Sequence, residues 1–396
     1  MRLKKYRLKN RLSSFITRGL RLAIILTLLP ALAEAVTPSS SRYPSPRQVD
    51  LASFIENEKR PQQQALDIFG KEKAKSAWAF YFDNDFLSPT SQDRDYTGGF
   101  SITLSGANAR KHPLSIDRFL VDTNRWLGIS STTDITLHSI EFGATAFTPE
   151  DTLATASLDH DRPYASLIYL SNSNQSISAD RTHSTMTTLT MGLLGLDVIK
   201  SFQKSLHQAT GSDPANGWDH QISAGGEPTF RFGLSRQKLN HSGHSKSGRG
   251  YEIHTALKAS LGYLTSLSWG ISSRWGKIKT PWWTFNPEAS EYAEKSAPLS
   301  ISSVPYHGRE FYFWAGANVH LRLYNAFLQG QFRDSDVTYA YHELHPVVVE
   351  GWMGFTRELH HGYRFSYVLR GQTAEINHGP ASRSSLWGGV IFSRAF

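Results

Sequence analysis

Long stretches of alternating apolar and polar residues restrict the fold of this chain more than any other feature. In 311–323, Phe, Ala, Val and Leu occupy every second position, and the positions between them carry mainly polar or bulky aromatic side chains. The same period of two occurs in 100–105 and 363–370. This period is typical of β-strands with one apolar and one polar face. The runs are longer than the strands of most soluble sandwiches, which have roughly 5–6 residues.

Such strands are typical of outer-membrane β-barrels, in which the apolar face meets lipid and the polar face meets the lumen. The last stretch, 386–396, also has a strand pattern and ends on Phe396, which resembles the assembly signal of bacterial outer-membrane barrels. The residues leave a soluble β-sandwich open as the alternative. We expect an all-β chain that forms a multi-pass antiparallel barrel in the outer membrane of a Gram-negative bacterium, with the barrel-assembly machinery as a partner.

Thirteen segments match the strand pattern, but bacterial single-chain barrels normally have an even number of strands. We therefore expect one segment to be wrong and the barrel to have about 12 strands. The segments are 78–85, 96–106, 134–147, 163–171, 184–194, 226–237, 251–262, 266–276, 309–323, 327–334, 346–357, 362–372 and 385–396.

Three polar segments between these strands suit long external loops: 107–133, 238–250 and 277–308. Trp282 and Trp283 in the third segment are candidates for the membrane interface, where Trp side chains are enriched. After residue 35 no apolar run is long enough to predict a membrane helix.

Residues 1–35 have the pattern of a secretory signal, with a basic start, an apolar core at 22–32 and an Ala-Glu-Ala cleavage site. The alternative is an uncleaved anchor. This segment holds eight of the 42 Lys and Arg and one of the 34 Asp and Glu, so the remaining chain has a formal charge of only +1. The high pI is therefore no argument for a nucleic-acid partner. We expect an N-terminal extension at 36–75 and a barrel domain at 76–396.

One stretch with a helical period interrupts the strands, at 197–211. Its apolar side chains fall three or four apart and form one stripe. Gln203 and His207 are four apart, which places them one turn from each other on one face. The sequence therefore predicts a short helix inserted between strands. An amide and an imidazole side by side suit a catalytic site, and a solvated helix face is the alternative.

Oxygen-bearing side chains gather around the end of the first strand and the start of the second. Asp83, Asn84 and Asp85 come first, and 93–99 then reads Asp-Arg-Asp-Tyr-Thr-Gly-Gly. Carboxylate and amide oxygens are the ligands that Ca²⁺ prefers. The spacing is not that of an EF-hand, so the fold would have to assemble any such site. A solvated loop with an Asx turn is the alternative.

Taken together, these short motifs resemble the lipid A 3'-O-deacylase family of outer-membrane enzymes. The resemblance covers roughly 78–396, and it is specific as a set although each motif alone is weak. The motifs are Asn84-Asp85, Asp93-Arg94-x-Tyr96-Thr97-x-Gly99, Thr148-Pro149-Glu150-Asp151, Asp161-Arg162-Pro163-Tyr164-Ala165, Gln203-x-x-x-His207 and Gly217-Trp218-x-x-Gln221.

The resemblance implies a calcium-dependent hydrolase of lipid A in lipopolysaccharide, which releases the 3'-linked acyloxyacyl chain. It implies His207 as the general base that activates water, with Gln203 supporting it. It further implies catalytic or substrate-holding roles for Asn84 and Thr97. The remaining implied residues are Asp85 and Asp213 at the metal and Arg94, Tyr96 and Arg162 at the substrate.

The chain departs from the family at two points. A Lys that family members carry shortly after the third strand has no counterpart in 148–161, which puts phosphate binding or efficiency in doubt. Asp213 stands where relatives have the longer Glu. Two other functions therefore remain open: a non-catalytic barrel that acts as a pore or binds lipid, and a phospholipase on the same scaffold.

Other kinds of catalytic site are disfavoured by the residues. The chain has no cysteine, which excludes thiolate catalysis and zinc fingers, and it has no Gly-x-Ser-x-Gly motif of a serine hydrolase. The histidine pairs at 241 and 244 and at 360 and 361 fall in predicted loops, where solvation is the simpler expectation.

Overall fold

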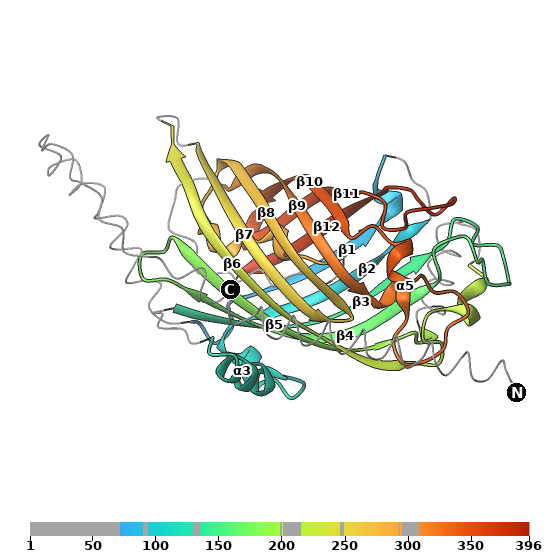
Figure 1. The fold of residues 1–396 in the computed structure, drawn as a ribbon. Coiled ribbons are helices and arrows are strands. Elements are labelled where there is room, and N and C mark those ends of the chain that lie inside the picture. Colours follow the sequence, from blue (N-terminus) through green and yellow to red (C-terminus); the bar gives the residue numbers. More distant parts are fainter. Residues whose placement is uncertain are drawn as a thin grey trace, which may run out of the picture. The chain divides into compact units, whose positions relative to one another are not determined.

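The computed structural model describes residues 72–89, 94–129, 135–198, 200, 215–245, 249–292, 294 and 309–395. In this part of the chain, twelve antiparallel strands close into a barrel, and β1 pairs with β12. The predicted fold class is thereby confirmed (Figure 1). The strands are β1 Ala77–Asn84, β2 Asp95–Ser105, β3 Ile135–Thr148, β4 Ala165–Ile177, β5 His183–Leu194, β6 Glu227–His244, β7 Gly250–Gly262, β8 Leu264–Lys277, β9 Phe311–Asn325, β10 Val347–Glu358, β11 Tyr363–Gln372 and β12 Ser385–Ala395.

Short helices connect some of these strands. The α-helices are α3 Asp117–Trp126 and α5 Ala326–Gln329. None of the helices in the described ranges has the length and apolar character needed to cross a bilayer. The 3₁₀ turns are η1 Asp85–Leu87, η2 Ala107–Lys111, η3 Gly217–His220, η4 Trp282–Thr284, η5 Pro287–Ala289, η6 Tyr341–Glu343 and η7 His360–Gly362.

The period of two appears in the barrel as an outer apolar face and an inner polar face. In β9, Val319 and Leu321 are exposed on the outside, whereas Asn318 and His320 are buried in the lumen. Outward apolar residues suit contact with lipid, and inward polar residues find partners on neighbouring strands. His320, for example, lies 2.9 Å from the Ser268 hydroxyl of β8.

Because consecutive strands are antiparallel, their connections alternate between the two ends of the barrel. The end at which Ala77 begins β1 and Ala395 ends β12 is called the terminal end below. The described residues of the connections 85–94, 149–164, 195–226, 326–346 and 373–384 lie at the opposite end, as does α5 (Figure 1).

The predicted strand at 327–334 is wrong, and it is the surplus segment among the thirteen. Its first residues belong to α5, where Ala326, Phe327 and Leu328 are all almost fully buried. Three consecutive buried residues suit a helical turn, whereas a half-buried strand would bury every second one. The Asn325 side chain caps this turn by accepting the Phe327 N–H at 3.0 Å, and Gly330 ends it with a φ of 64°.

The three predicted external loops all connect strands at the terminal end, and their structure differs from the prediction. Segment 107–133 contains α3, and most of 238–250 continues the β6–β7 hairpin. The described part of 277–308 turns into the barrel. Trp282 and Trp283 are buried there against β3 and β4 rather than placed at a membrane interface.

The described residues of 280–294 turn into the lumen and contact its inner wall. Glu288 is fully buried and receives hydrogen bonds from Gln237 of β6 at 2.5 Å and from Ser272 of β8 at 2.7 Å. Arg370 of β11 donates to the Pro287 carbonyl at 2.8 Å, from the other side of the barrel. Contacts with strands on both sides place this segment across the lumen. This position was not predictable from the sequence, because the charged residues of the segment resemble those of a solvated loop.

Candidate active site

The described residues that carry the family resemblance gather at one end of the barrel. Asn84 ends β1, Tyr96 and Thr97 begin β2, Thr148 ends β3 and Ala165 begins β4. All of these strand ends face away from the terminal end, and this end is called the site end below. Gln203, His207, Asp213 and Asp93 lie outside the described residues, so their predicted roles stay predictions.

The turn between β1 and β2 holds Asn84 and Asp85 in buried positions. The Asn84 side-chain oxygen accepts the Phe86 N–H at 2.9 Å and so caps the turn η1. The Asp85 carboxylate is 3% exposed and accepts the Arg94 backbone N–H at 3.0 Å. Both side chains are therefore fixed by backbone groups of this connection, and the bond of Asn84 has the Asx geometry that short turns favour.

Gly98 brings β2 close to this turn. It pairs in register with Asn84, and its φ of 149° lies in the region that favours glycine. A Cβ at this position would lie 2.4 Å from the Asp83 carbonyl oxygen and 3.1 Å from the Asn84 amide nitrogen. The register between β2 and β3 shifts next to it, between Tyr96 and Gly98. Such a bulge re-aims the intervening side chain. Thr97 is buried there, with its hydroxyl oxygen 2.7 Å from that of Thr148.

The first and last described residues of the connection between β5 and β6 are both held at the site end of the barrel. The Lys200 ammonium lies 2.7 Å from the Asp219 carboxylate, and the Gln221 amide donates to Asp197 at 3.3 Å. Gln221 also accepts a hydrogen bond from Ser166 of β4 at 2.8 Å. The described residues on either side of 201–214 are thus held at the site end, next to the start of β4.

Trp218 and Gly217 pack this connection against Tyr164, which lies just before β4. The Trp218 ring is fully buried and packs 4.9 Å from the ring of Tyr164, whose hydroxyl donates to the Thr152 carbonyl at 3.2 Å. A Cβ on Gly217 would lie 2.5 Å from the Tyr164 ring. The motif residues of two different connections therefore pack against each other.

Arg162 is an internal cation of the site end. It is 4% exposed, forms an ion pair with Glu375 and lies 3.8 Å from Asp95. Its guanidinium also lies 4.9 Å from the centre of the Phe147 ring. Burial alone would raise the pKa of Glu375, but the guanidiniums of Arg162 and Arg322 outweigh burial and hold that pKa below its usual range. With both carboxylates this close, Arg162 is placed to position its neighbours.

Asp161 and Arg383 extend this ionic network to a third connection. The Asp161 carboxylate accepts backbone N–H groups of Glu150 and Arg162, both at 2.7 Å. Arg383 donates to Asp161 at 2.7 Å and to Asp95 at 2.9 Å. Sequence reasoning missed Glu375 and Arg383, because each is a single charged residue more than 200 positions from its partner and belongs to no local motif.

Arg94 and Tyr96 differ in how accessible they are. The Arg94 side chain is 26% exposed and pairs with Glu150. Tyr96 is 1% exposed and belongs to an aromatic cluster with Phe147, Tyr292 and Trp387 that fills the lumen below the site end. Of the three residues expected at the substrate, Arg94 is therefore the one with an open side chain, while Tyr96 and Arg162 support the site from inside.

Ca²⁺ requires six to eight oxygen ligands, and the described residues provide only part of such a set. Asp85 and Asn84 are hard oxygen donors of the right type. No group of three His, Cys, Asp or Glu disposed to hold a metal occurs within the described ranges. The other predicted ligand, Asp213, lies outside them. The types of oxygen donor fit Ca²⁺. The remaining ligands would have to come from residues outside the described ranges.

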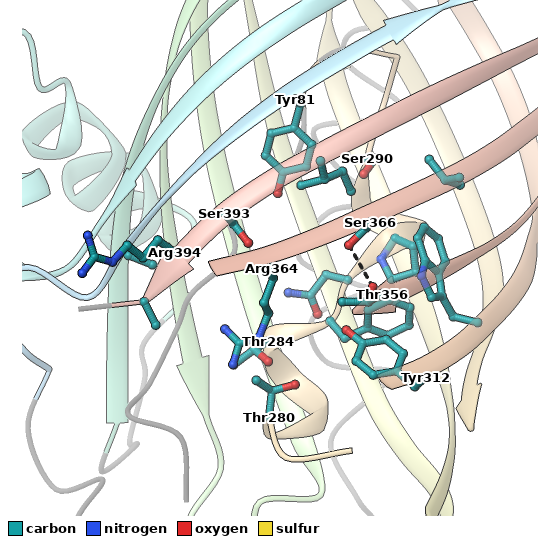
Figure 2. Close-up of a pocket in the computed structure, with 18 of the residues that line it drawn as sticks. Tyr81, Thr280, Thr284, Ser290, Tyr312, Thr356, Arg364, Ser366, Ser393 and Arg394 are labelled. Carbon is teal, nitrogen blue, oxygen red and sulfur yellow. Dashed lines mark hydrogen bonds between the residues drawn. The ribbon is translucent and has the colours of Figure 1, made fainter. Parts of the chain in front are cut away.

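A cavity of about 120 Å³ lies elsewhere in the barrel, beside the segment that fills the lumen (Figure 2). It is lined by hydroxyl groups such as those of Tyr81, Thr280 and Tyr312, and by Arg364. Arg364 is paired there with Glu310 at 2.9 Å. Of the oxygen-bearing residues singled out in the sequence, Asp83 lines this cavity, whereas none of the described residues to which the resemblance assigns a role does. The cavity is therefore not part of the candidate site.

The family model of "Outer membrane protein LpxR" matches residues 25–396. Among solved structures, LpxR from Salmonella typhimurium superposes with a TM-score of 0.63 at 16% identity, covering 81% of this chain and 100% of that one. The β domain of the Bordetella autotransporter BrkA reaches a TM-score of 0.39 at 8% identity, covering 82% of this chain and 100% of the other. No curated protein matches the chain in sequence.

Proposed function

The chain belongs to the family of outer membrane protein LpxR, and from this premise we propose that it hydrolyses the 3'-linked acyloxyacyl ester of lipid A. The observation that carries the proposal is the convergence of the buried Asn84, Asp85 and Thr97 with both anchors of 201–214 at one end of the barrel. We propose that the segment with the base, 201–214, lies at the wall where the proposed oxygen ligands are.

In the proposed reaction, His207 removes a proton from water, and the water oxygen forms a bond to the ester carbonyl carbon. The bond from this carbon to the sugar oxygen then breaks, and the proton passes from His207 to the leaving alcohol. A positioned base of this kind contributes typically about 10²–10⁴-fold in rate. Gln203, four residues before His207 in the sequence, would keep the imidazole oriented.

We further propose Asp85 and Asp213 as the residues that hold Ca²⁺, which would supply positive charge where the carbonyl oxygen becomes anionic. Asn84 and Thr97 hold the water or the ester beside them. Because Asn84 and Asp85 are bonded to their own turn, they are fixed before substrate arrives. Preorganised groups of this kind cost no rearrangement during the reaction.

Arg94 is proposed to meet the charged part of the lipid. It is partly exposed, although it shares its charge with Glu150. The family Lys that is missing from 148–161 would have added a second cation here. A site at the barrel wall also lets a lipid reach it without leaving the membrane.

The residues inside the lumen disfavour the alternative function of a pore. The described residues of 280–294 cross the lumen, where Glu288 and Pro287 are bonded to strands on both sides. The aromatic cluster around Tyr96 fills the space nearer the site end. These groups leave little room for an open channel within the described part of the chain.

Mass spectrometry of lipid A from cells with and without this chain tests the proposal. The expected result is a loss of mass equal to one acyloxyacyl unit, with phospholipids unchanged. New lysophospholipids with intact lipid A would replace the proposal with a phospholipase. Unchanged lipids, with the barrel present in the outer membrane, would refute hydrolysis altogether.

A further inference from the structure

The outer wall of the barrel carries a row of aromatic side chains near the terminal end. Tyr251, Trp275, Phe313, Phe355 and Tyr367 are direct neighbours in register across β7 to β11. The first three are between 46% and 48% exposed. Aromatic girdles of barrels sit at the level of the lipid headgroups. This row therefore marks the membrane interface on the side of the terminal end.

Basic side chains lie just beyond this row, toward the terminal end. Lys277 follows Trp275 by two residues in β8, and Arg357 follows Phe355 by two residues in β10. Both are in register with Phe311, which lies between them. Arg249 directly precedes β7, whose first residue is in register with Gly276. The cations thus stand at the depth at which the phosphates of this leaflet lie.

These side chains line one groove on the outside of the barrel. Its walls are formed by Trp275, Phe311 and Phe313 on the apolar side and by Arg249, Lys277, Arg309 and Arg357 on the basic side, with a volume of about 700 Å³. Arg309 is the cation of this set that contacts a described side chain, that of His360, at 2.7 Å. Small-molecule sites span about 300–1,000 Å³. The groove therefore has room for a lipid headgroup beside the aromatic rings.

The charge of this groove is not cancelled by its neighbours. Glu310 is fully buried and is bonded to Arg364 at 2.9 Å, and the Glu358 carboxylate lies 3.2 Å from the Lys279 ammonium. In contrast, Arg249, Lys277 and Arg357 are exposed and form no ion pair with any residue that the structure describes. A cluster of exposed cations at the interface favours an anionic lipid.

We propose that this groove binds the phosphate headgroup of an anionic phospholipid, from the leaflet that surrounds the terminal end. The acyl chains would lie along the aromatic row, and the phosphate would be held by Arg249, Lys277 and Arg357. The site is on the opposite end from the candidate active site and does not depend on the proposed function.

Native mass spectrometry of the full chain in detergent tests this site with phosphatidylglycerol as the probe. The double variant Lys277→Gln/Arg357→Gln removes two of the three cations proposed to hold the phosphate. The control Lys111→Gln/Arg118→Gln removes two exposed cations of another connection at the same end of the barrel. Folding of each variant is checked by the heat-dependent gel shift of the barrel.

The unmodified chain and the control are expected to retain one phosphatidylglycerol molecule, and the double variant is expected to bind it about thirtyfold more weakly. Equal weakening by both variants would show general attraction between charges and would overturn the site. So would equal binding of diacylglycerol, which lacks phosphate, or inorganic phosphate binding with the same affinity as the lipid.

Discussion

The two ends of the barrel use their charges in different ways. At the site end, Arg162 and Arg383 are largely buried and each is bonded to carboxylates from other connections. At the terminal end, Arg249, Lys277 and Arg357 are exposed on the outer wall and have no ion pair with the described residues. A buried, paired charge fixes the position of its neighbours, whereas an exposed and unpaired one is available to a ligand. The difference suits a rigid catalytic end and a lipid-contacting end.

Removing a buried cation should have the largest effect on the free energy of unfolding. Arg162→Met would leave the buried Glu375 and Asp95 without one of their cations. Breaking such a pair typically costs about 3–5 kcal/mol. Equilibrium unfolding in detergent should show a loss of this size, while Arg125→Met, which removes an exposed pair with Asp122, should cost less than about 1 kcal/mol. Equal losses would remove the distinction between buried and exposed charges.

Calcium removal should act on the site end alone. Chelation is expected to lower the rate of lipid A hydrolysis by at least about 10²-fold, since losing one oxyanion-stabilising group costs about that much. Added Ca²⁺ should restore the rate, and Asp85→Asn should abolish that restoration. Asp122→Asn, an exposed carboxylate on α3, serves as the control. A rate that chelators leave unchanged would exclude the metal.

A methyl group on Gly98 should disturb the turn that holds Asn84. Gly98→Ala places a Cβ 2.4 Å from the Asp83 carbonyl oxygen at an unfavourable φ, which should cost about 1–3 kcal/mol of stability. It should also lower hydrolysis, because Asn84 must shift. Gly233→Ala is the matched control, since its Cβ would meet its nearest atom at 3.9 Å. If both variants behave alike, the tight approach at Gly98 has no role.

The smallest effect on stability is expected for an exposed ion pair at the site end, that of His220 and Asp336. The hydrogen bond to Asp336 raises the pKa of His220 above 6.5. A raised histidine pKa stabilises the fold below about pH 6.5, and the stabilisation is lost as the pH rises through the folded-state pKa. Solvent screening keeps it well under about 1 kcal/mol. Asp336→Asn should flatten this pH dependence in equilibrium unfolding; an unchanged profile would exclude the pair as its source.

Periodicity was sufficient to predict the barrel from the sequence, because a strand that separates lipid from lumen must alternate along its whole length. The surplus strand at 327–334 shows where this signal fails: Phe327 and Leu328 are apolar because they are buried in a helical turn inside the barrel. The lumen-filling segment was misread for the opposite reason. Glu288 and Glu294 look solvated in sequence, but they are paired with side chains of the inner wall.

The candidate site was predictable only where its residues are local in sequence. Asn84 and Asp85 bond to their own turn, and Gly217 and Trp218 pack as one unit, so both pairs leave a readable motif. Arg383 donates a hydrogen bond to Asp95, which is 288 positions away in the sequence. No short sequence pattern can predict such a contact. Long-range ion pairs are set by the closure of the barrel rather than by neighbouring residues.

The most direct test of the account is the initial rate of lipid A deacylation by the purified chain, compared with His207→Ala and with His241→Ala. His241 is an exposed histidine near the terminal end and matches the substitution without touching the site. The account predicts a loss of about 10²–10⁴-fold for His207→Ala, with a folded barrel and an unchanged rate for His241→Ala. A fully active His207→Ala variant would contradict the assignment of the base and, with it, the proposed catalytic role of the site end.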